Sequence, residues 1–249
     1  MKYLLSRDSL PIVELLARER TLCAFDFDGT LASIVDDPER AAMRGRTRTL
    51  MRRMASLYPC IVVSGRARAD VLKKLTDVPV LRVIGNHGAE TRETSTGRTP
   101  VEQWKKALQA GLGAIPGLWI ENKGLSLAVH YRLCADKAEV RRRILAHVHT
   151  LPRTRVFGGK LVVNVTVDGA PNKGDALASE RDRLRCNWVL YVGDDVNDED
   201  AFALDGNIVA VRVGRKLRSH AGFYLRTQDE IDKLLEELIR LRRRLPAHT

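Results

Sequence analysis

The sequence predicts an α/β protein that combines a parallel sheet, with helices on both faces, and a smaller inserted α/β unit. Apolar runs typical of buried strands alternate with helical segments over the first 91 residues, and the alternation returns after residue 169. Between these parts, short strands follow one another through glycine turns. With 249 residues, of which 44% are hydrophobic and 29% charged, the chain can bury a sizeable core.

The first part, residues 1–91, is predicted from apolar runs and helix start signals. Ser9 precedes a helix at residues 11–20 as its cap. Further helices are expected at residues 38–57 and 69–75. Short apolar runs predict strands at residues 21–25, 60–63 and 80–84. Because helices separate these strands, we expect them to pair in parallel.

The inserted unit, residues 92–168, begins with a predicted linker at residues 91–100, which is rich in threonine, glycine and charge. Its helices are expected at residues 101–112 and 137–149, and its strands at residues 119–122, 126–131, 155–157 and 161–167. Neighbouring strands joined by glycine turns indicate an antiparallel sheet backed by the two helices.

The last part, residues 169–249, resumes the alternation of the first. Helices are expected at residues 175–184 and 198–204, and strands at residues 188–192 and 208–213. These strands can extend the parallel sheet of the first part. The insert therefore separates two halves of one domain in the sequence.

The net charge of +11 is carried largely by arginine, which is compatible with a nucleic-acid partner. The densest runs, residues 141–143 and 240–244, lie opposite the apolar faces of helical segments, so solvated helix surface explains them. Aromatic residues are only 5%, and no RNA-recognition signature is present. We do not expect a nucleic-acid partner, and an RNA-binding protein is the alternative. A positive field would still attract a phosphorylated substrate.

The four cysteines are widely spaced and lie mostly in apolar contexts, which predicts core residues in a reducing compartment. Charged residues interrupt the apolar run near the N-terminus, and no segment reaches membrane-spanning length. We therefore expect a cytoplasmic protein with no membrane contact. The oligomeric state is left open.

Two carboxylates follow the strand expected at residues 21–25. Asp26 and Asp28 lie two positions apart, so in an extended segment they face one way while Phe27 turns back to the core. Open α/β sheets bind ligands at the carboxyl ends of their strands. One acid could attack an electrophile and the other move a proton, which requires unlike environments. A solvated turn is the alternative.

Three further polar segments also lie at strand ends or helix starts. The strand at residues 60–63 runs into Ser64, Gly65 and Arg66, and Lys173 stands at the start of a later helix. The strand at residues 188–192 is followed by the acidic segment 193–200. A calcium loop is the alternative for that segment, although it lacks the twelve-residue spacing and final Glu of an EF-hand.

Together these segments resemble the four motifs of the haloacid dehalogenase (HAD) superfamily, most of whose members are phosphatases that work through an aspartyl-phosphate. The resemblance implies a Rossmann-like HAD core with Asp26 as the nucleophile. Asp28 would protonate the leaving group and later activate water, with Thr30 orienting it. Lys173 would bridge the phosphoryl group and Asp26 as a point charge.

The same resemblance implies a phosphate site and a magnesium site. Ser64, with the backbone N–H groups at Gly65 and Arg66, would hold phosphoryl oxygens at a helix N-terminus. Oxygen ligands and a phosphate suit Mg²⁺. Its direct ligands would be Asp26, the carbonyl of Asp28, and Asp194, while Asp195 and Asp198 would hold its waters.

The position of the insert resembles the C2-type caps of this superfamily, which close over the core and select the substrate. The segments that carry a closer resemblance, to trehalose-6-phosphate phosphatases, are residues 85–90, 121–124, 130–132, 159–160 and 194–202. The substrate-binding residues implied are His87, Glu121, Lys123, His130, Arg132 and Asn164.

Each cap residue has a simpler interpretation. Glu121 and Lys123 alternate on a strand and could form a solvated face. His130 could be a core histidine, and Arg132 could pair with a surface acid. Asn164 departs from the family, which usually has a Glu there; a neutral amide still binds hydroxyls but loses the charged contact.

We therefore expect a magnesium-dependent phosphoric monoester hydrolase that acts on a small-molecule sugar phosphate. The resemblance implies trehalose 6-phosphate as the substrate, in trehalose biosynthesis. The alternatives are a phosphatase of the same fold acting on sucrose 6-phosphate or a glycosyl-glycerate phosphate, which the neutral Asn164 favours, and a phosphomutase, which would return the phosphoryl group to the sugar.

Overall fold

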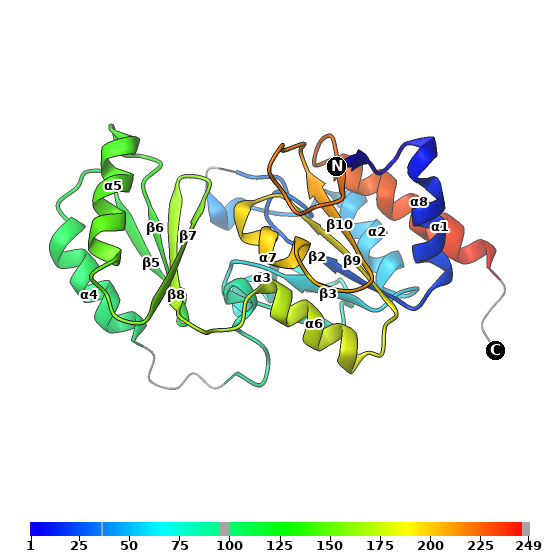
Figure 1. Cartoon of the computed structure of the whole chain (residues 1–249), viewed down its shortest axis with the longest axis horizontal. Helices are drawn as coiled ribbons and strands as arrows, with labels where there is room; N and C mark the ends of the chain where they lie inside the picture. Colours follow the sequence, from blue (N-terminus) through cyan, green and yellow to red (C-terminus); the bar gives the residue numbers. More distant parts are fainter. Residues whose placement is uncertain (36, 95–99, 246–249) are drawn as a thin grey trace.

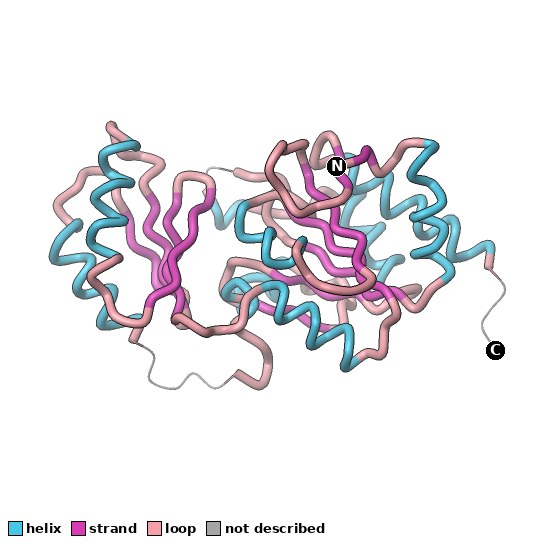
Figure 2. The backbone as a smooth tube through the Cα atoms, in the orientation of Figure 1, coloured by secondary structure: helices cyan, strands magenta, loops and turns pink. Residues whose placement is uncertain are grey.

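A computed structural model describes residues 1–35, 37–94 and 100–245, and these form two lobes side by side. Figure 1 shows a larger lobe with a central sheet between helices, and a smaller lobe in which two helices cover one face of a second sheet. Within the described residues, Figure 2 shows no helix or strand shared between the lobes, and a loop at residues 168–172 joins them. The predicted combination of two α/β units is confirmed.

The large sheet has seven strands, all parallel, in the spatial order β1-β11-β10-β9-β2-β3-β4. Its strands are β1 (Lys2–Tyr3), β2 (Thr21–Phe25), β3 (Cys60–Val63), β4 (Arg82–Ile84), β9 (Trp188–Gly193), β10 (Ile208–Val213) and β11 (Phe223–Leu225). The edge strand β1 and its neighbour β11 were not predicted, because runs of two and three residues are too short to show a periodicity.

Helices cover both faces of this sheet, as buried parallel strands require. The α-helices of the large lobe are α1 (Leu10–Arg18), α2 (Gly45–Ala55), α3 (Arg68–Lys74), α6 (Lys173–Arg183), α7 (Glu199–Phe202) and α8 (Glu230–Arg244). Cys23 and Phe25 of β2 pack in the core layer that includes α1, α2 and α8, whereas Leu22 and Ala24 pack against α6 and α7. The alternation along one strand thus separates two core layers.

The order in which the strands are added reverses at β2, and this reversal determines where a ligand can enter. From β2 the sheet grows through β3 to β4, and after the insert the chain returns on the other side of β2 as β9. Such a reversal leaves a crevice outside the carboxyl ends of the two central strands. Asp26 and Asp28 follow β2, and Asp194 follows β9, at this point.

The smaller lobe contains an antiparallel sheet, as predicted. Its strands lie in the order β5-β6-β8-β7. Its elements are β5 (Trp119–Asn122), β6 (Ser126–His130), β7 (Thr154–Gly159), β8 (Val162–Val167), α4 (Val101–Leu112) and α5 (Lys137–Val148). They share a hydrophobic core made only of residues between 101 and 167. The domain boundaries at residues 91/92 and 168/169 stay a prediction, and part of the predicted linker lies outside the described residues.

Short 3-10 turns complete the described elements: Arg7–Ser9, Pro38–Arg40, Asn86–Gly88 and Val196–Asp198. One prediction was wrong here, because residues 38–57 do not form a continuous helix. Residues between the 3-10 turn and α2 are extended, and Met43 forms an antiparallel bridge with Ala32 while its side chain is buried. Burial against the core therefore overrides local helix propensity. Ser9 stands at the N-cap of α1, but its hydroxyl donates to Tyr3 O instead of the helix.

The structure confirms the buried cysteines, but it confirms only one of the two arginine runs as solvated helix surface. All four cysteines are buried thiols without a disulfide. Arg141, Arg142 and Arg143 are exposed on α5, whereas Arg242 of α8 packs over the Tyr58 ring and donates to Ala17 O. Among the described helices, none combines the length and the apolar character needed to cross a bilayer. The cytoplasmic location stays a prediction.

The separate core of the smaller lobe gives a test of the domain boundaries. Ile144→Ala removes a fully buried side chain of that core, and Ile61→Ala does the same in the large lobe. Each should cost about 2–5 kcal/mol of stability. We expect Ile144→Ala to accelerate amide hydrogen exchange only within residues 101–167 and Ile61→Ala only outside them. Acceleration in both lobes by either variant would contradict two domains.

Candidate active site

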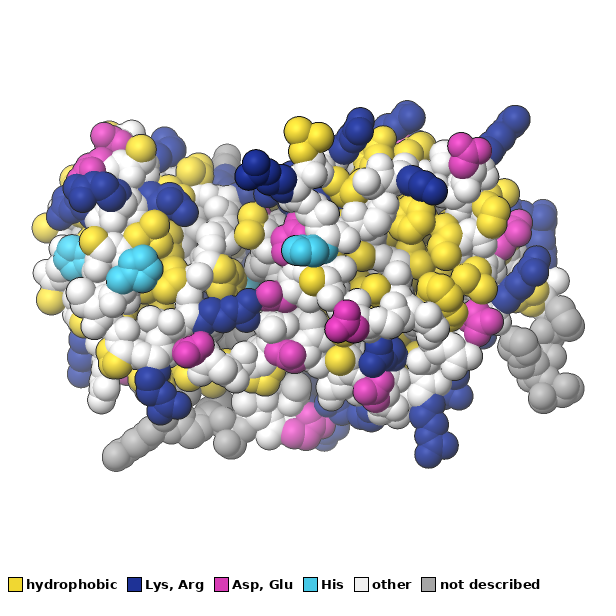
Figure 3. All heavy atoms as spheres, in the orientation of Figure 1, with side chains coloured by type: hydrophobic (Ala, Val, Ile, Leu, Met, Phe, Trp, Pro, Cys, Tyr) yellow, Lys and Arg dark blue, Asp and Glu magenta, His cyan; other side chains and the backbone are white. Residues whose placement is uncertain are grey.

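A cleft of about 1070 Å³ lies between the lobes at the carboxyl ends of β2, β3 and β9. Figure 3 shows acidic side chains gathered where the lobes meet, with basic side chains beside them. The predicted residues that line this cleft are Asp26, Asp28, Gly65, Arg66, His87, Glu121, Lys123, His130, Arg132, Asn164, Asp194 and Asp195. The structure therefore brings together most of the predicted set from both lobes.

Behind the cleft wall, Lys173 links two buried carboxylates. Its Nζ lies 3.1 Å from Asp26 Oδ1 and 2.6 Å from Asp198 Oδ1, and only 1% of its side chain is exposed. Lys173 is the first residue of α6, where Asn172 accepts from the N–H groups of Gly174 and Asp175. This cap fixes the start of the helix and so directs the ammonium at the sheet.

Each carboxylate oxygen of Asp198 already accepts two hydrogen bonds. Oδ1 accepts hydrogen bonds from Lys173 and the Tyr191 hydroxyl, both at 2.6 Å. Oδ2 accepts from the backbone N–H groups of Asp194 at 2.8 Å and Asp195 at 2.9 Å. Asp198 therefore holds Lys173 and the loop after β9 in place.

Burial and mutual repulsion raise the pKa values of two carboxyl groups in this acidic cluster. Burial raises the pKa of Asp26; Lys173 opposes this, but the neighbouring acids reinforce it, so the pKa lies well above its ordinary value. Burial and Asp198 raise the pKa of Asp194 to about 6, against the opposing charge of Lys160. Although burial also acts to raise the pKa of Asp198, Lys173 and its other donors lower it. A further cation would stabilise the ionised forms of Asp26 and Asp194.

Asp28 is held by Arg66 in a bidentate pair. Arg66 Nε donates to Asp28 Oδ2 at 2.6 Å and Nη2 donates to Oδ1 at 2.8 Å, while Nη1 reaches Asp70 at 2.6 Å. The predicted orienting contact from Thr30 is not observed, because in the described part of the chain its buried hydroxyl has no hydrogen-bond partner. The geometry assigns this orientation to Arg66 instead.

Ser64 ends β3 as predicted, but not at a helix N-terminus. The helix α3 begins four residues later at Arg68, and Glu90 Oε2 accepts from the Arg68 N–H at 2.7 Å. Ser64 Oγ accepts from the Arg66 N–H at 3.2 Å. Any phosphoryl oxygen near Ser64 would thus meet loop N–H groups, since the first donor of the helix is already satisfied.

The acidic cluster has the donor set of a magnesium site. Carboxylate oxygens of Asp26, Asp194 and Asp198 lie within 4.8 Å of one another, and Asp26 and Asp194 have ligand capacity that Asp198 lacks. Gly29, at φ +80°, brings the backbone so close to Asp194 that an added Cβ would lie 2.2 Å from Oδ2. The Lys160 ammonium, from the turn between β7 and β8, binds the same Oδ2 at 2.6 Å. A cation already occupies this acidic position, which supports the fit of Mg²⁺.

The cap side of the cleft carries a connected set of polar groups. Lys123 Nζ donates to Gly65 O at 3.1 Å and lies 3.8 Å from Glu121 Oε2. His130 Nε2 and Glu121 Oε2 are 3.0 Å apart. Despite its burial, His130 and Lys123 lower the pKa of Glu121, so it is a carboxylate near neutral pH. Glu121 and Lys123 are thus not simply a solvated strand face.

His87 is buried beside the cleft in a left-handed conformation, with φ 60°. Its ring packs edge-on against Phe157 with centroids 4.8 Å apart, and Nδ1 lies 3.4 Å from Asn197 Nδ2. Burial and then the charges of Lys123 and Lys173 lower its pKa well below the ordinary value, while the Asn164 side chain acts in the opposite sense. His87 is therefore a neutral ring, which can donate one hydrogen bond through one ring nitrogen and accept one through the other.

Two residues that join the lobes were not predicted as site residues. Asn86 donates to Lys123 O at 3.0 Å and accepts from the Ser126 hydroxyl at 2.6 Å. Lys160 reaches Asp194 as described above. Both stand in segments that carry the family resemblance, but their contacts cross between lobes and cannot be seen in a local pattern.

Comparison with known proteins identifies relatives with a common description. The sequence model of the trehalose-phosphatase family matches residues 24–216. A trehalose-phosphate phosphatase of Mycobacterium marinum is 34% identical over 206 residues, which is 76% of this chain and 53% of that protein. The probable trehalose-phosphate phosphatase J of Arabidopsis thaliana is 29% identical over 219 residues, 78% of this chain and 59% of its own. This chain spans about half the length of these curated relatives.

A solved structure gives the same fold. The C-terminal domain of a Candida albicans trehalose-6-phosphate phosphatase superposes with a TM-score of 0.78 at 21% identity, over 92% of this chain and 96% of that one. The likeness supports the two-lobed α/β fold.

The contact between Lys160 and Asp194 predicts competition between this lysine and a metal ion. Lys160→Met should strengthen Mg²⁺ binding about two- to fivefold, because a half-exposed ammonium contributes up to about 1 kcal/mol to such a pair. Isothermal titration calorimetry without substrate measures this affinity. Lys105→Met on α4 is the matched control and should change nothing. Weaker Mg²⁺ binding by Lys160→Met would contradict the competition.

Proposed function

The chain belongs to the trehalose-phosphatase family, and from this we propose that it hydrolyses trehalose 6-phosphate to trehalose and phosphate, in trehalose biosynthesis. One observation carries the proposal: the paired Asp26 and Lys173 lie at a cleft whose opposite wall presents Glu121, Lys123 and His130. Phosphoryl chemistry and hydroxyl recognition are thus available within one cleft.

In the first step, Asp26 is the nucleophile. One carboxylate oxygen bonds to phosphorus as the bond from phosphorus to the sugar oxygen breaks, which gives an aspartyl-phosphate. Lys173, 3.1 Å from Asp26 Oδ1, offsets charge on the attacking group and the phosphoryl oxygens. Because Asp198 holds this ammonium, it stays in position when Asp26 becomes esterified.

Asp28 moves the protons of both steps. Protonated Asp28 donates to the departing sugar oxygen; its carboxylate then takes a proton from the water that attacks phosphorus and releases Asp26. Before this donation, the bidentate contact with Arg66 must be exchanged. Two phosphoryl oxygens can accept from the guanidinium in a bidentate contact of the same kind, so substrate binding would both recruit Arg66 and release Asp28.

Asp26, the Asp28 carbonyl and Asp194 would hold Mg²⁺, with Asp195 supporting its waters. Asp198, predicted to share that role, would instead fix the backbone of the loop that carries Asp194, because both of its oxygens already accept two hydrogen bonds. When bound, the ion would neutralise charge on the phosphoryl oxygens. Lys160, which pairs with Asp194 here, would then be displaced and could meet the phosphoryl group.

The cap residues would bind sugar hydroxyls. Glu121 accepts hydrogen bonds and Lys123 donates them. Their charged atoms, Glu121 Oε2 and Lys123 Nζ, lie 3.8 Å apart within the cleft. His130 and Arg132 line the same wall. Asn164 is buried on β8 and lies near His87, where its neutral amide can still bond a hydroxyl. Because this position is neutral, another sugar phosphate of similar size is the second candidate.

A phosphate-release screen tests the function directly. Purified protein is incubated with trehalose 6-phosphate, sucrose 6-phosphate, glucose 6-phosphate and a glycosyl-glycerate phosphate, with Mg²⁺ and with chelator. We expect release to be fastest from trehalose 6-phosphate and to stop with chelator. No release from any of these would contradict a phosphatase, and an isomeric phosphate product would indicate a mutase.

Asp26→Asn should abolish turnover, by more than about 10³-fold, because an amide is a poor nucleophile at phosphorus. Steady-state phosphate release measures the loss. Asp77→Asn, an exposed acid outside the cleft, is the control and should keep the wild-type rate. A near-normal, metal-dependent rate in Asp26→Asn would refute the nucleophile.

Asp28→Asn should let the phosphoenzyme form and slow its breakdown, because an amide cannot take a proton from water. With a substrate whose leaving group needs no proton, we expect labelled phosphate to accumulate on the protein, as measured by acid-quenched trapping. A variant that never retains label while Asp26 is intact would count against this role.

A further inference from the structure

The strand β5 and the residue after it, Lys123, present a row of side chains to the cleft. Trp119, Glu121 and Lys123 are spaced two residues apart, and all three line the cleft. Lys123 stands nearest the phosphoryl end, since its Nζ is 3.1 Å from Gly65 O at the end of β3. With a rise of about 3.4 Å per residue, Trp119 lies ~14 Å further along the strand. The row therefore leads outward from the reacting end of the cleft.

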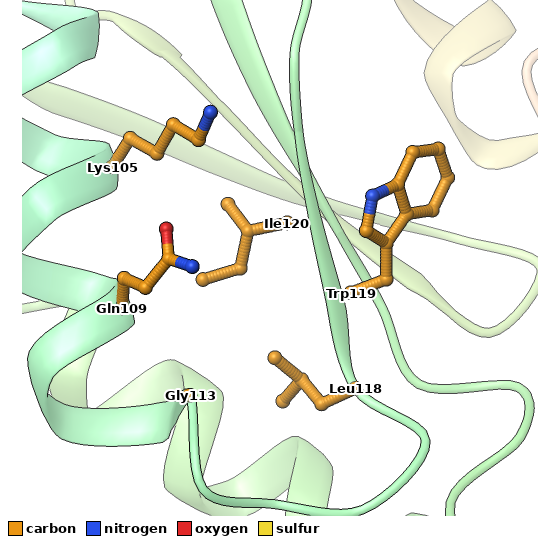
Figure 4. A pocket seen from close by; sticks show the side chains of 6 residues that line it. All are labelled: Lys105, Gln109, Gly113, Leu118, Trp119 and Ile120. Carbon is orange, nitrogen blue, oxygen red and sulfur yellow. The ribbon is translucent and has the colours of Figure 1, made fainter.

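Trp119 is an exposed indole on a rigid support. Its side chain is 52% exposed, yet its ring stacks on His130 with centroids 4.6 Å apart and planes at 21°. Glu121 in turn fixes His130 through Nε2. Figure 4 shows Trp119 projecting from β5 on the side away from α4, opposite to Ile120 and Lys105. The indole is thus held over the cleft and excluded from the hydrophobic core of the cap.

A second apolar side chain stands at the same edge of the cleft. Leu133, in the loop after β6, is 83% exposed and also lines the cleft. Gly117, at φ +80°, brings the turn before β5 against that loop, because an added Cβ would lie 2.5 Å from Leu133 O. Single exposed apolar residues are common, but two that line the same edge of a cleft indicate an apolar contact with a ligand.

We propose that the Trp119 indole binds the sugar ring farthest from the phosphoryl group, by stacking on its C–H face. This inference rests on the proposed function. A pyranose has an apolar face and a hydroxyl rim, so an indole can cover the face while Glu121 and Lys123 bind the rim nearer phosphorus. A monosaccharide phosphate anchored at Asp26 does not extend along the row to Trp119. The indole therefore selects a disaccharide phosphate over a monosaccharide phosphate.

The test compares a two-ring and a one-ring substrate. Trp119→Ala should raise KM for trehalose 6-phosphate roughly tenfold, which corresponds to ~1.4 kcal/mol of lost contact, and leave kcat within about twofold. KM for glucose 6-phosphate should not change. Trp119→Phe, which keeps an aromatic face, should restore most of the affinity. Leu81→Ala, an exposed apolar residue outside the cleft, is the surface control.

Equal increases in KM for both substrates would overturn the proposal, because they would indicate a general role in holding the cap. An unchanged KM for trehalose 6-phosphate in Trp119→Ala would also overturn it. Far-ultraviolet circular dichroism checks that the variants are folded; a half-exposed side chain can be removed without opening the core.

A binding measurement separates this proposal from the proposed function. Titration of the wild type with trehalose should shift tryptophan emission, and the shift should vanish in Trp119→Phe, since neither of the other two tryptophans, Trp104 and Trp188, lines the cleft. Glucose should give a much smaller shift. If the wild type releases no phosphate from trehalose 6-phosphate but the shift is present, the function fails and the stacking stands. If phosphate is released and Trp119→Phe keeps the full shift, the stacking fails alone.

Discussion

The buried ammonium of Lys173 is the interaction on which the site depends. It neutralises part of a cluster in which Asp26 and Asp198 are almost fully removed from water, a condition that is unfavourable for carboxylates without a cation. Asp198 shares this ammonium with Asp26 and also binds the backbone of the loop after β9. The carboxylate that holds the ammonium beside Asp26, the proposed nucleophile, therefore also fixes the geometry of the acidic loop.

The charge of the cluster also links the two lobes. Lys160 and Lys123 of the cap reach Asp194 and Gly65 of the large lobe, and Asn86 bonds the strand region of the cap. These contacts place the ammonium groups of Lys160 and Lys123 beside the acidic cluster of the large lobe. Any movement of the cap therefore changes the electrostatic environment of the reacting groups as well as the access of water.

The cap strand β5 divides recognition by chemistry. Near the large lobe it presents ionised groups, Lys123 and Glu121, and at its far end the Trp119 indole. This gradient suits a ligand that is anionic at one end and carries an apolar ring face at the other. The neutral Asn164, buried on β8 of the same sheet, can supply hydrogen bonds without charge. Specificity would then come from the length of the ligand as much as from its hydroxyls.

The sequence by itself determined the two sheets, the strand ends and the acidic motifs, because the period of apolar residues and the positions of Asp26, Asp28 and Asp194 are local properties. It missed the short strands β1 and β11, which are too short to show a period, and the break before α2, where Met43 packs into the core. Only the tertiary structure decided which groups meet. The Arg66 clamp on Asp28, the contact from Lys160 to Asp194 and the support of Trp119 by His130 join residues far apart in the chain or on neighbouring strands. Such partners are set by packing and by charge balance in the folded chain, which no local pattern records.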